Sequence, residues 1–433
     1  MQYKTQWVTA LVANLSGEIF ELEGYAATGM AGTSFVPLTK KDMIPMPYGS
    51  ELMFLPQRYP VLYNIDTETI EIIEENPYEP GEPVFPVAAF NSPGYVNSYI
   101  SAYKEIDRQH YLPLFSYGAA GWLEDKFYSA AILIDKEPRQ DLRYMNQEKI
   151  VAGVEKMRKR LPSNRLRKHL EKCALEYGCP AGKNFFLGRY EAPLPTSKFC
   201  NANCLGCISL QKNDSIPCSQ ERIDFTPCPL EIAEIALTHI RQVKNSIVSF
   251  GQGCEGDPLF AADVIEPAIR KIRRSTISGT INMNTNGSMP KVLEKLFDAG
   301  LDSIRISINS FREPCYNTYF RPKGYTFSDV MKSISTALEQ KKFVSINYLN
   351  CPGFTDTFEE LESFIQFRKK FPINMVQWRN LNFDPVKYWE EMNKAADHGP
   401  CLGMENILTK INKTFPDLRF GYFNPPKEKW NLV

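Results

Sequence analysis

The chain has no hydrophobic run long enough to cross a membrane. A membrane-spanning helix needs about 18 or more apolar residues, and the densest run, AAILI at 130–134, is far shorter. The chain also has no net charge, because its 50 basic and 50 acidic residues cancel. Overall charge therefore gives no reason to expect a nucleic acid or a membrane as partner. The N-terminal segment has little positive charge before its short apolar run and fits a strand better than a secretory signal.

Histidine is scarce, with four residues, whereas cysteine occurs eleven times. An odd cysteine count in a large chain without a signal peptide favours reduced thiols and metal chemistry over disulfides. We therefore expect a cytoplasmic globular protein.

The chain is long enough for more than one domain. Residues 1–145 are expected to form an N-terminal β-rich accessory domain, with strand-forming residues on both sides of the turn Asn64-Ile65-Asp66-Thr67. Residues 146–190 follow as a basic helical linker that is interrupted at Pro162. Its segment 156–172 carries eight Lys or Arg residues and one Glu. Such a face could hold phosphates, but packing of a solvated helix on the larger domain is the favoured interpretation.

Residues 191–385 alternate short apolar runs with amphipathic helices. The runs lie at 246–250, 280–283, 303–308, 343–349 and 374–378. Between two of them, Ile232, Ile235 and Ile240 share one helical face, and Gly300 stands where a helix should end. Alternation of this kind indicates parallel strands with helical crossovers. We predict an α/β protein with a partial (β/α)6 TIM-like barrel, followed by a C-terminal extension at 386–433.

Three cysteines occur within eight residues in CNANCLGC, at Cys200, Cys204 and Cys207. They follow PLPTSKF (193–199), which we interpret as the first barrel strand. A structural zinc site needs four ligands, often as two Cys-x2-Cys pairs, and the sequence has no second pair. An iron–sulfur cluster accepts thiolate ligands on its irons, and three cysteines would leave one iron open.

CNANCLGC resembles the signature of the radical S-adenosylmethionine (radical SAM) superfamily, and the resemblance covers roughly 190–385. It implies a [4Fe-4S] cluster on Cys200, Cys204 and Cys207, with SAM bound to the open iron. It also implies that cluster reduction cleaves SAM to a 5′-deoxyadenosyl radical that abstracts hydrogen. The branch of the superfamily is not assigned by this motif, and no residue is predicted as a catalytic hydrogen donor.

Four further motifs follow predicted strands and resemble SAM-binding positions of the family. The first, SFGQGCEGDPLF at 249–260, departs from the family pattern, because Cys254 stands among the glycines and either Glu255 or Asp257 could take the acidic role. The others are Thr285-Asn286-Gly287, RISINS at 305–310 and VQWRNLNFDP at 376–385. The residues predicted to bind the cofactor are Gly251, Gly253, Glu255, Asp257, Asn286, Ser307, Asn309 and Arg379. Asn380 is an alternative to Arg379.

The other cysteines could include the ligands of a second, auxiliary cluster. Cys179, Cys218 and Cys228 flank the main motif, but their spacing matches no known ligand pattern, so buried or spare thiols are the favoured interpretation. Cys173 and Cys401 are further candidates for such an auxiliary site.

The main functional hypothesis is a radical SAM enzyme that modifies a small molecule or a peptide. Its electron donor would be a protein such as flavodoxin or ferredoxin, and nucleic acid and membrane are not expected as partners. One alternative is an RNA-modifying radical SAM methyltransferase, which would use the basic 156–172 segment and Cys401. The other is a non-catalytic iron–sulfur scaffold, against which the glycine-rich acidic loop argues.

Overall fold

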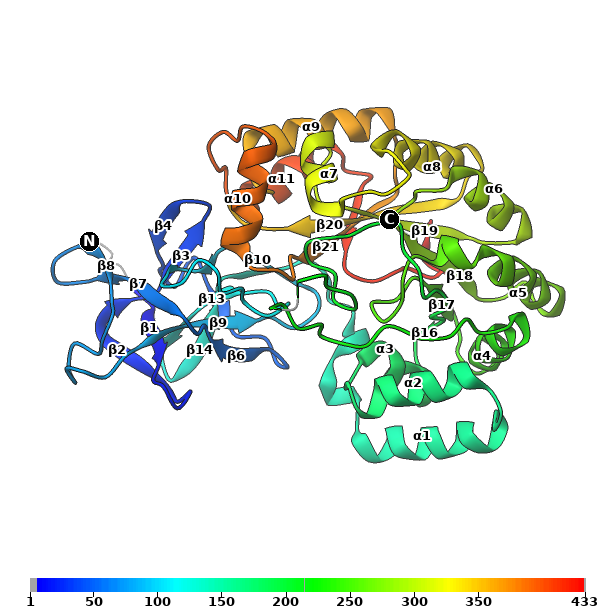
Figure 1. Cartoon of the computed structure of the whole chain (residues 1–433), viewed down its shortest axis with the longest axis horizontal. Coiled ribbons are helices and arrows are strands. Elements are labelled where there is room, and N and C mark those ends of the chain that lie inside the picture. The colour runs from blue at the N-terminus through cyan, green and yellow to red at the C-terminus, as the bar shows by residue number, and fades with distance from the viewer. Residues whose placement is uncertain (1–5, 214, 432–433) are drawn as a thin grey trace.

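A computed structural model describes residues 6–213 and 215–431. An N-terminal β domain and a larger α/β unit lie side by side, with helices α1 to α3 packed below the latter in the view of Figure 1. None of the helices in these ranges is long and apolar enough to cross a lipid bilayer.

The N-terminal domain contains a sheet of thirteen strands within the described residues. Nine of them form the path β12-β7-β2-β1-β9-β13-β11-β3-β4, and the other four pair with strands beside this path. Every pairing in it is antiparallel where it is described. The strands of this sheet are β1 (Thr9–Ala13), β2 (Ile19–Ala26), β3 (Thr28–Ala31), β4 (Ser34–Pro37), β5 (Ile44–Pro45), β6 (Glu51–Phe54), β7 (Arg58–Asn64), β8 (Thr69–Ile72), β9 (Phe85–Phe90), β11 (Ile100–Ser101), β12 (Tyr103–Glu105), β13 (Gly118–Leu123) and β14 (Lys126–Ser129). A separate pair is formed by β10 (Tyr95–Asn97) and β15 (Ala131–Leu133).

The predicted turn at residues 64–67 is confirmed. It joins β7 to β8, and the side-chain oxygen of Asn64 accepts hydrogen bonds from the backbone N–H groups of Asp66 and Thr67 at 3.1 and 3.2 Å. This side-chain turn explains why Asn stands at the end of β7.

The helical segment consists of α1 (Gln147–Arg160), α2 (Arg165–Leu175) and α3 (Pro180–Leu187). Pro162 lies in the break between α1 and α2, as predicted, and Asn164 caps α2 by accepting from the N–H of Arg167. The basic side chains of this segment make ion pairs. Arg158 and Arg167 both contact Glu171, and Arg165 binds Glu231 on the barrel side at 2.8 Å. Of these pairs, that of Arg165 reaches the barrel, and buried apolar side chains of the segment, among them Leu166, Leu170 and Phe185, belong to the same hydrophobic core as the barrel strands.

The α/β unit is a half-barrel whose seven parallel strands, counted over the described residues, run in chain order from β16 to β22. They are β16 (Glu191–Pro193), β17 (Ile247–Phe250), β18 (Thr280–Thr285), β19 (Ser303–Ile308), β20 (Phe343–Asn350), β21 (Met375–Asn380) and β22 (Arg419–Gly421). The helices of this unit are α4 (Pro229–Gln242), α5 (Ala262–Ser275), α6 (Pro290–Ala299), α7 (Glu313–Phe320), α8 (Phe327–Glu339), α9 (Phe358–Lys370), α10 (Pro385–Ala395) and α11 (Met404–Thr414). Short 3₁₀ turns are η1 (Pro138–Gln140), η2 (Leu142–Tyr144), η3 (Pro258–Ala261) and η4 (Lys427–Lys429).

The predicted fold class is confirmed, and its details differ in two places. A further strand, β22, comes from the region expected to be a C-terminal extension and pairs with β21. The first strand ends at Pro193, so PLPTSKF is not a strand beyond that residue. The reason is that the N–H groups of Thr196 and Ser197 donate to Glu255 instead of to a neighbouring strand.

The two parts are joined through Asp384, the N-cap of α10. Its carboxylate accepts from Arg58 Nη2 at 2.8 Å, from the Tyr103 hydroxyl at 3.1 Å and from the N–H of Leu112 at 3.2 Å. The side chains of Arg58 and Asp384 are both 0% exposed. A charge pair this deeply buried holds the β domain in one position, because either charge left alone would be costly.

Candidate functional site

The loop that follows β16 carries CNANCLGC and is fixed by its backbone. The N–H groups of Asn203 and Leu205 donate to the carbonyls of Phe320 and Tyr319 at the end of α7, at 2.9 and 3.0 Å. Gly206 has no room for a side chain, since a Cβ would lie 2.8 Å from the carbonyl oxygen of Asn382. The loop is therefore fixed to the end of α7 and to Asn382 by backbone contacts of Asn203, Leu205 and Gly206.

Cys200, Cys204 and Cys207 are half-buried in this loop and interact with one another electrostatically. Burial raises the pKa of the Cys200 thiol to about 11 and places that of Cys204 well above its usual range. Thiols with such pKa values would stay protonated in a metal-free protein, whereas a coordinated thiol is deprotonated by the metal. The three donors fit an iron–sulfur cluster, whose irons take thiolate ligands.

Arg222 is a cation beside these thiols. Its Nη2 donates to Cys207 Sγ at 3.5 Å, and its Nε donates to Ser209 Oγ at 3.2 Å. A guanidinium near a ligand sulfur stabilises negative charge on it. Sequence reasoning missed Arg222, which lies fifteen residues after Cys207 in a stretch without a recognisable pattern.

The turn 251–257 after β17 is built around Glu255. Its buried carboxylate accepts four backbone hydrogen bonds, from Gly251 and Gln252 at 2.7 Å each and from Thr196 and Ser197 at 2.8 and 2.9 Å. Burial raises the pKa of Glu255 to about 7, and these hydrogen bonds oppose that shift. Glu255 thus ties the turn to the start of the cysteine loop.

Two glycines let the turn approach neighbouring backbone. Gly251 has a φ of +79°, and a Cβ there would lie 1.8 Å from the carbonyl oxygen of Asn284. At Gly256, which sequence reasoning did not single out, a Cβ would lie 2.0 Å from the carbonyl oxygen of Phe199. Only glycine fits either position. Gly253 differs, since its Cβ would meet the side-chain ends of Gln220 and Ile208.

Asp257 connects the turn to the end of β18. It accepts from the Thr285 hydroxyl at 2.8 Å and from the N–H of Asn286 at 2.7 Å. Asn286 in turn donates through Nδ2 to Asn201 Oδ1 inside the cysteine motif, at 2.8 Å. The structure therefore brings Gly251, Glu255, Asp257 and Asn286 together with the cysteine loop. Asn201 was also missed by sequence reasoning, although it lies within the motif.

The remaining predicted cofactor residues occupy other surroundings. Asn309 is fully buried and donates to the Tyr388 hydroxyl on α10 and to the Cys315 carbonyl, both at 3.2 Å. Ser307 is half-buried on β19 and pairs in register with Asn347. Arg379 donates to the carbonyl of Tyr422 and lies over the Tyr422 ring at 3.4 Å. Its neighbour Asn380 binds the β domain, accepting from the N–H of Asn97 at 2.8 Å and donating to the Tyr95 carbonyl at 3.1 Å.

A cavity of ≈ 470 Å³ lies against the cysteine loop at Cys204. It is bordered by Tyr111 of the β domain and by Phe383 near α10, and basic side chains surround it. These are Arg108, Lys212, Arg321, Lys387 and Lys394, and two acidic side chains also line the cavity: Glu391, which pairs with Arg321 and Lys394, and Glu390, which lies 3.8 Å from Lys387. Proximity of Lys323 lowers the pKa of Lys212, which shows that like charges gather beside the loop.

Comparison with known proteins gives the same assignment as the cysteine loop. The family model "Radical SAM superfamily" matches residues 194–367. The mitochondrial GTP 3′,8-cyclase of Arabidopsis thaliana is 28% identical over 234 residues, covering 50% of this chain and 55% of the relative. The GTP 3′,8-cyclase of Limosilactobacillus fermentum is 30% identical over 209 residues, covering 46% and 56%.

The chain thus spans about half the length of these curated relatives. Among solved structures, the [FeFe]-hydrogenase maturase HydG matches with 17% identity and a TM-score of 0.37, covering 64% of this chain and 67% of that one. Residues 194–367, which include the cysteine loop and strands β17 to β20, thus match the radical SAM superfamily, and over about half of its length the chain is distantly similar to the GTP 3′,8-cyclases.

Proposed function

We propose that this radical SAM enzyme cleaves SAM reductively and modifies an anionic small molecule or peptide. Cys200, Cys204 and Cys207 would hold a [4Fe-4S] cluster, and the cluster with SAM supplies, on reduction, a 5′-deoxyadenosyl radical. The observation that carries the proposal is the attachment of the cysteine loop to the glycine turn through Glu255. An iron–sulfur scaffold alone would not need a second loop held in this way.

The turn 251–257 and Asn286 are proposed to bind the cofactor SAM. The carboxylates of Glu255 and Asp257 already accept hydrogen bonds from protein groups. Their proposed role is therefore to shape the turn. The backbone of the turn, rather than these carboxylates, would contact SAM. Ser307, Asn309 and Arg379 stay predictions as cofactor contacts.

Two arginines inside the barrel support an anionic substrate. Arg305 projects from β19 and donates to Gln377 Oε1 at 2.9 Å, while its buried Nε has no partner among the described residues. Burial and the neighbouring charge of Arg379 lower the pKa of Arg305 to about 9. The nearby carboxylate of Glu191 is engaged by Arg139 at 2.7 Å. An anion bound between Arg305 and Arg379 would relieve their repulsion.

The basic side chains around the cavity at Cys204 support an acidic electron-transfer protein as reductant, such as flavodoxin or ferredoxin. Charge complementarity increases the rate at which such partners meet. The cavity is a suitable docking position for an electron donor, because residues of the cysteine loop, including Cys204, line it.

The test is formation of 5′-deoxyadenosine from SAM by anaerobically reconstituted protein with a chemical reductant. Wild type should form it, Cys204→Ala should not, and Cys228→Ala should, since Cys228 is an exposed thiol at the start of α4. Cleavage retained in Cys204→Ala would refute the proposal.

The substrate part needs a separate measurement. Binding of GTP and of inorganic triphosphate to the SAM-loaded protein should exceed binding of neutral guanosine, and Arg305→Gln should weaken it at least tenfold, about 1.4 kcal/mol. Equal binding of guanosine and GTP would argue against an anionic substrate.

A further inference from the structure

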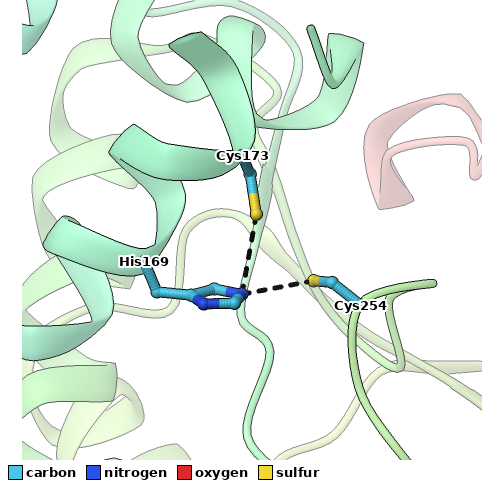
Figure 2. A group of neighbouring side chains, drawn as sticks. All are labelled: His169, Cys173 and Cys254. Atoms are coloured by element: carbon cyan, nitrogen blue, oxygen red, sulfur yellow. Dashed lines mark hydrogen bonds between the residues drawn. The ribbon is translucent and has the colours of Figure 1, made fainter. Parts of the chain in front are cut away.

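Three soft ligands lie close together outside the cysteine loop. His169 and Cys173 are one turn apart on α2, and Cys254 belongs to the turn 251–257. Their ligand atoms all lie within 4.8 Å of one another. Both cysteines are buried and His169 is half-buried. Figure 2 shows the two sulfur atoms pointing toward the same edge of the His169 ring.

The distances match those around a single tetrahedral ion. His169 Nε2 lies 3.5 Å from Cys254 Sγ and 3.6 Å from Cys173 Sγ. Zinc bonds of about 2.3 Å to sulfur and about 2.0–2.1 Å to nitrogen, at the tetrahedral angle, place nitrogen and sulfur about 3.6 Å apart. A hydrogen bond explains this geometry less well, because one ring N–H points at one acceptor whereas two sulfurs lie equally close to the same nitrogen.

An iron–sulfur cluster fits this group poorly. Its thiolates bind different irons and are therefore spread further apart than the ligands of one ion. A His and Cys set converging on one point is instead a zinc donor set.

We propose that His169, Cys173 and Cys254 bind one zinc ion, with Cys179 as the fourth ligand. The N–H of Cys179 donates to the Cys173 carbonyl at 2.9 Å, and its thiol interacts electrostatically with Cys173 and Cys254. Structural zinc sites are almost always four-coordinate. Cys179 is not part of the group whose ligand atoms lie within 4.8 Å of one another, so its sulfur would have to move to reach the ion.

The ion would connect α2 to the turn that shapes the proposed SAM site. Cys254 directly precedes Glu255, whose carboxylate holds the start of that turn and the segment that leads into the cysteine loop. The N–H of Ile223 also donates to the Cys254 carbonyl at 2.8 Å. Zinc bound here would restrict the turn in its folded position, so its role would be structural, since all four coordination sites would be occupied by protein.

The test is zinc and iron content of anaerobically purified wild-type protein, measured by elemental analysis beside variants. Wild type should contain about one zinc per chain, and Cys173→Ser with Cys254→Ser should lose at least nine-tenths of it while keeping its iron. Cys218→Ser is the matched control, because Cys218 is exposed in a loop, and it should keep its zinc.

A second measurement separates ligand loss from misfolding. X-ray absorption at the zinc edge of the intact protein should give three sulfur ligands at about 2.3 Å and one nitrogen at about 2.0–2.1 Å. Zinc-free wild type, a Cys173–Cys254 disulfide found by mass spectrometry, or iron lost together with zinc in the double variant would each overturn the proposal. None of these outcomes depends on whether the protein cleaves SAM.

Discussion

The cysteine loop and the group of His169, Cys173 and Cys254 meet at the same turn but are built in opposite ways. The loop takes its three thiols from eight consecutive residues, and Gly256 and Asp257 attach to it by donating to Ser197 and Phe199. The other group assembles only when α2 packs against the turn. The metal binding proposed at the first site would therefore depend on a local loop, whereas the metal binding proposed at the second would depend on tertiary structure. Both sites share the turn 251–257.

Replacing all three loop cysteines by alanine should have the largest effect. Cys200/Cys204/Cys207→Ala should lose all of its cluster iron, about four atoms per chain, and all SAM cleavage. If the two sites are separate, zinc should remain at about one per chain. The measurement is iron, sulfide and zinc content after reconstitution. Iron that survives in this variant would reveal an auxiliary cluster and break the distinction between the two sites.

Asp384→Asn tests whether the β domain contributes to either site. The change leaves the buried Arg58 with Glu105, 3.7 Å away, as its charged partner, and losing one partner of a buried pair costs up to about 3–5 kcal/mol. Urea unfolding should show this loss, whereas iron and zinc content of the folded protein should stay at wild-type values. The exposed pair Lys40 and Glu124 provides the control, and Glu124→Gln should leave the unfolding midpoint unchanged. Metal loss in Asp384→Asn would mean that domain docking supports the metal sites.

Gly251→Ala should disturb both sites at once, because it acts on their shared turn. The added Cβ meets backbone at Asn284, and the positive φ adds about 1–2 kcal/mol of strain. We expect the KM for SAM to rise at least tenfold and zinc occupancy to fall, with iron retained. Gly324→Ala is the matched control, since Gly324 has a similar φ of +73° but no atom within 4 Å of the added Cβ. An unchanged KM in Gly251→Ala would remove this turn from the SAM site.

The different construction of the two sites explains what the sequence could predict. Cys200, Cys204 and Cys207 are specified by spacing alone, and so are the strand runs and the cap at Gly300, whose φ is +114°. Cys173 and Cys254 are eighty-one positions apart, and nothing local marks them as partners. The short strand β22 was missed because three residues carry no readable alternation. Asn380, predicted as an alternative cofactor contact, forms hydrogen bonds with backbone of the β domain, and only the domain arrangement determines these bonds.

The smallest effect is expected outside the cysteine loop, at the basic side chains beside the cavity. Lys212→Glu with Lys323→Glu should slow cluster reduction by reduced flavodoxin several-fold at low salt, because attraction to an acidic partner becomes repulsion. At about 1 M salt the difference should disappear, since charges are screened within about 3 Å. Lys410→Glu with Lys413→Glu changes the net charge equally, at two exposed positions of α11. The cluster of this variant should be reduced at the wild-type rate. Reduction by dithionite should be equal in all three proteins, because a small reductant needs no docking surface. If the α11 variant slowed as much as the Lys212 variant, net charge rather than this surface would govern reduction, and the cavity beside Cys204 would have no special role in electron delivery.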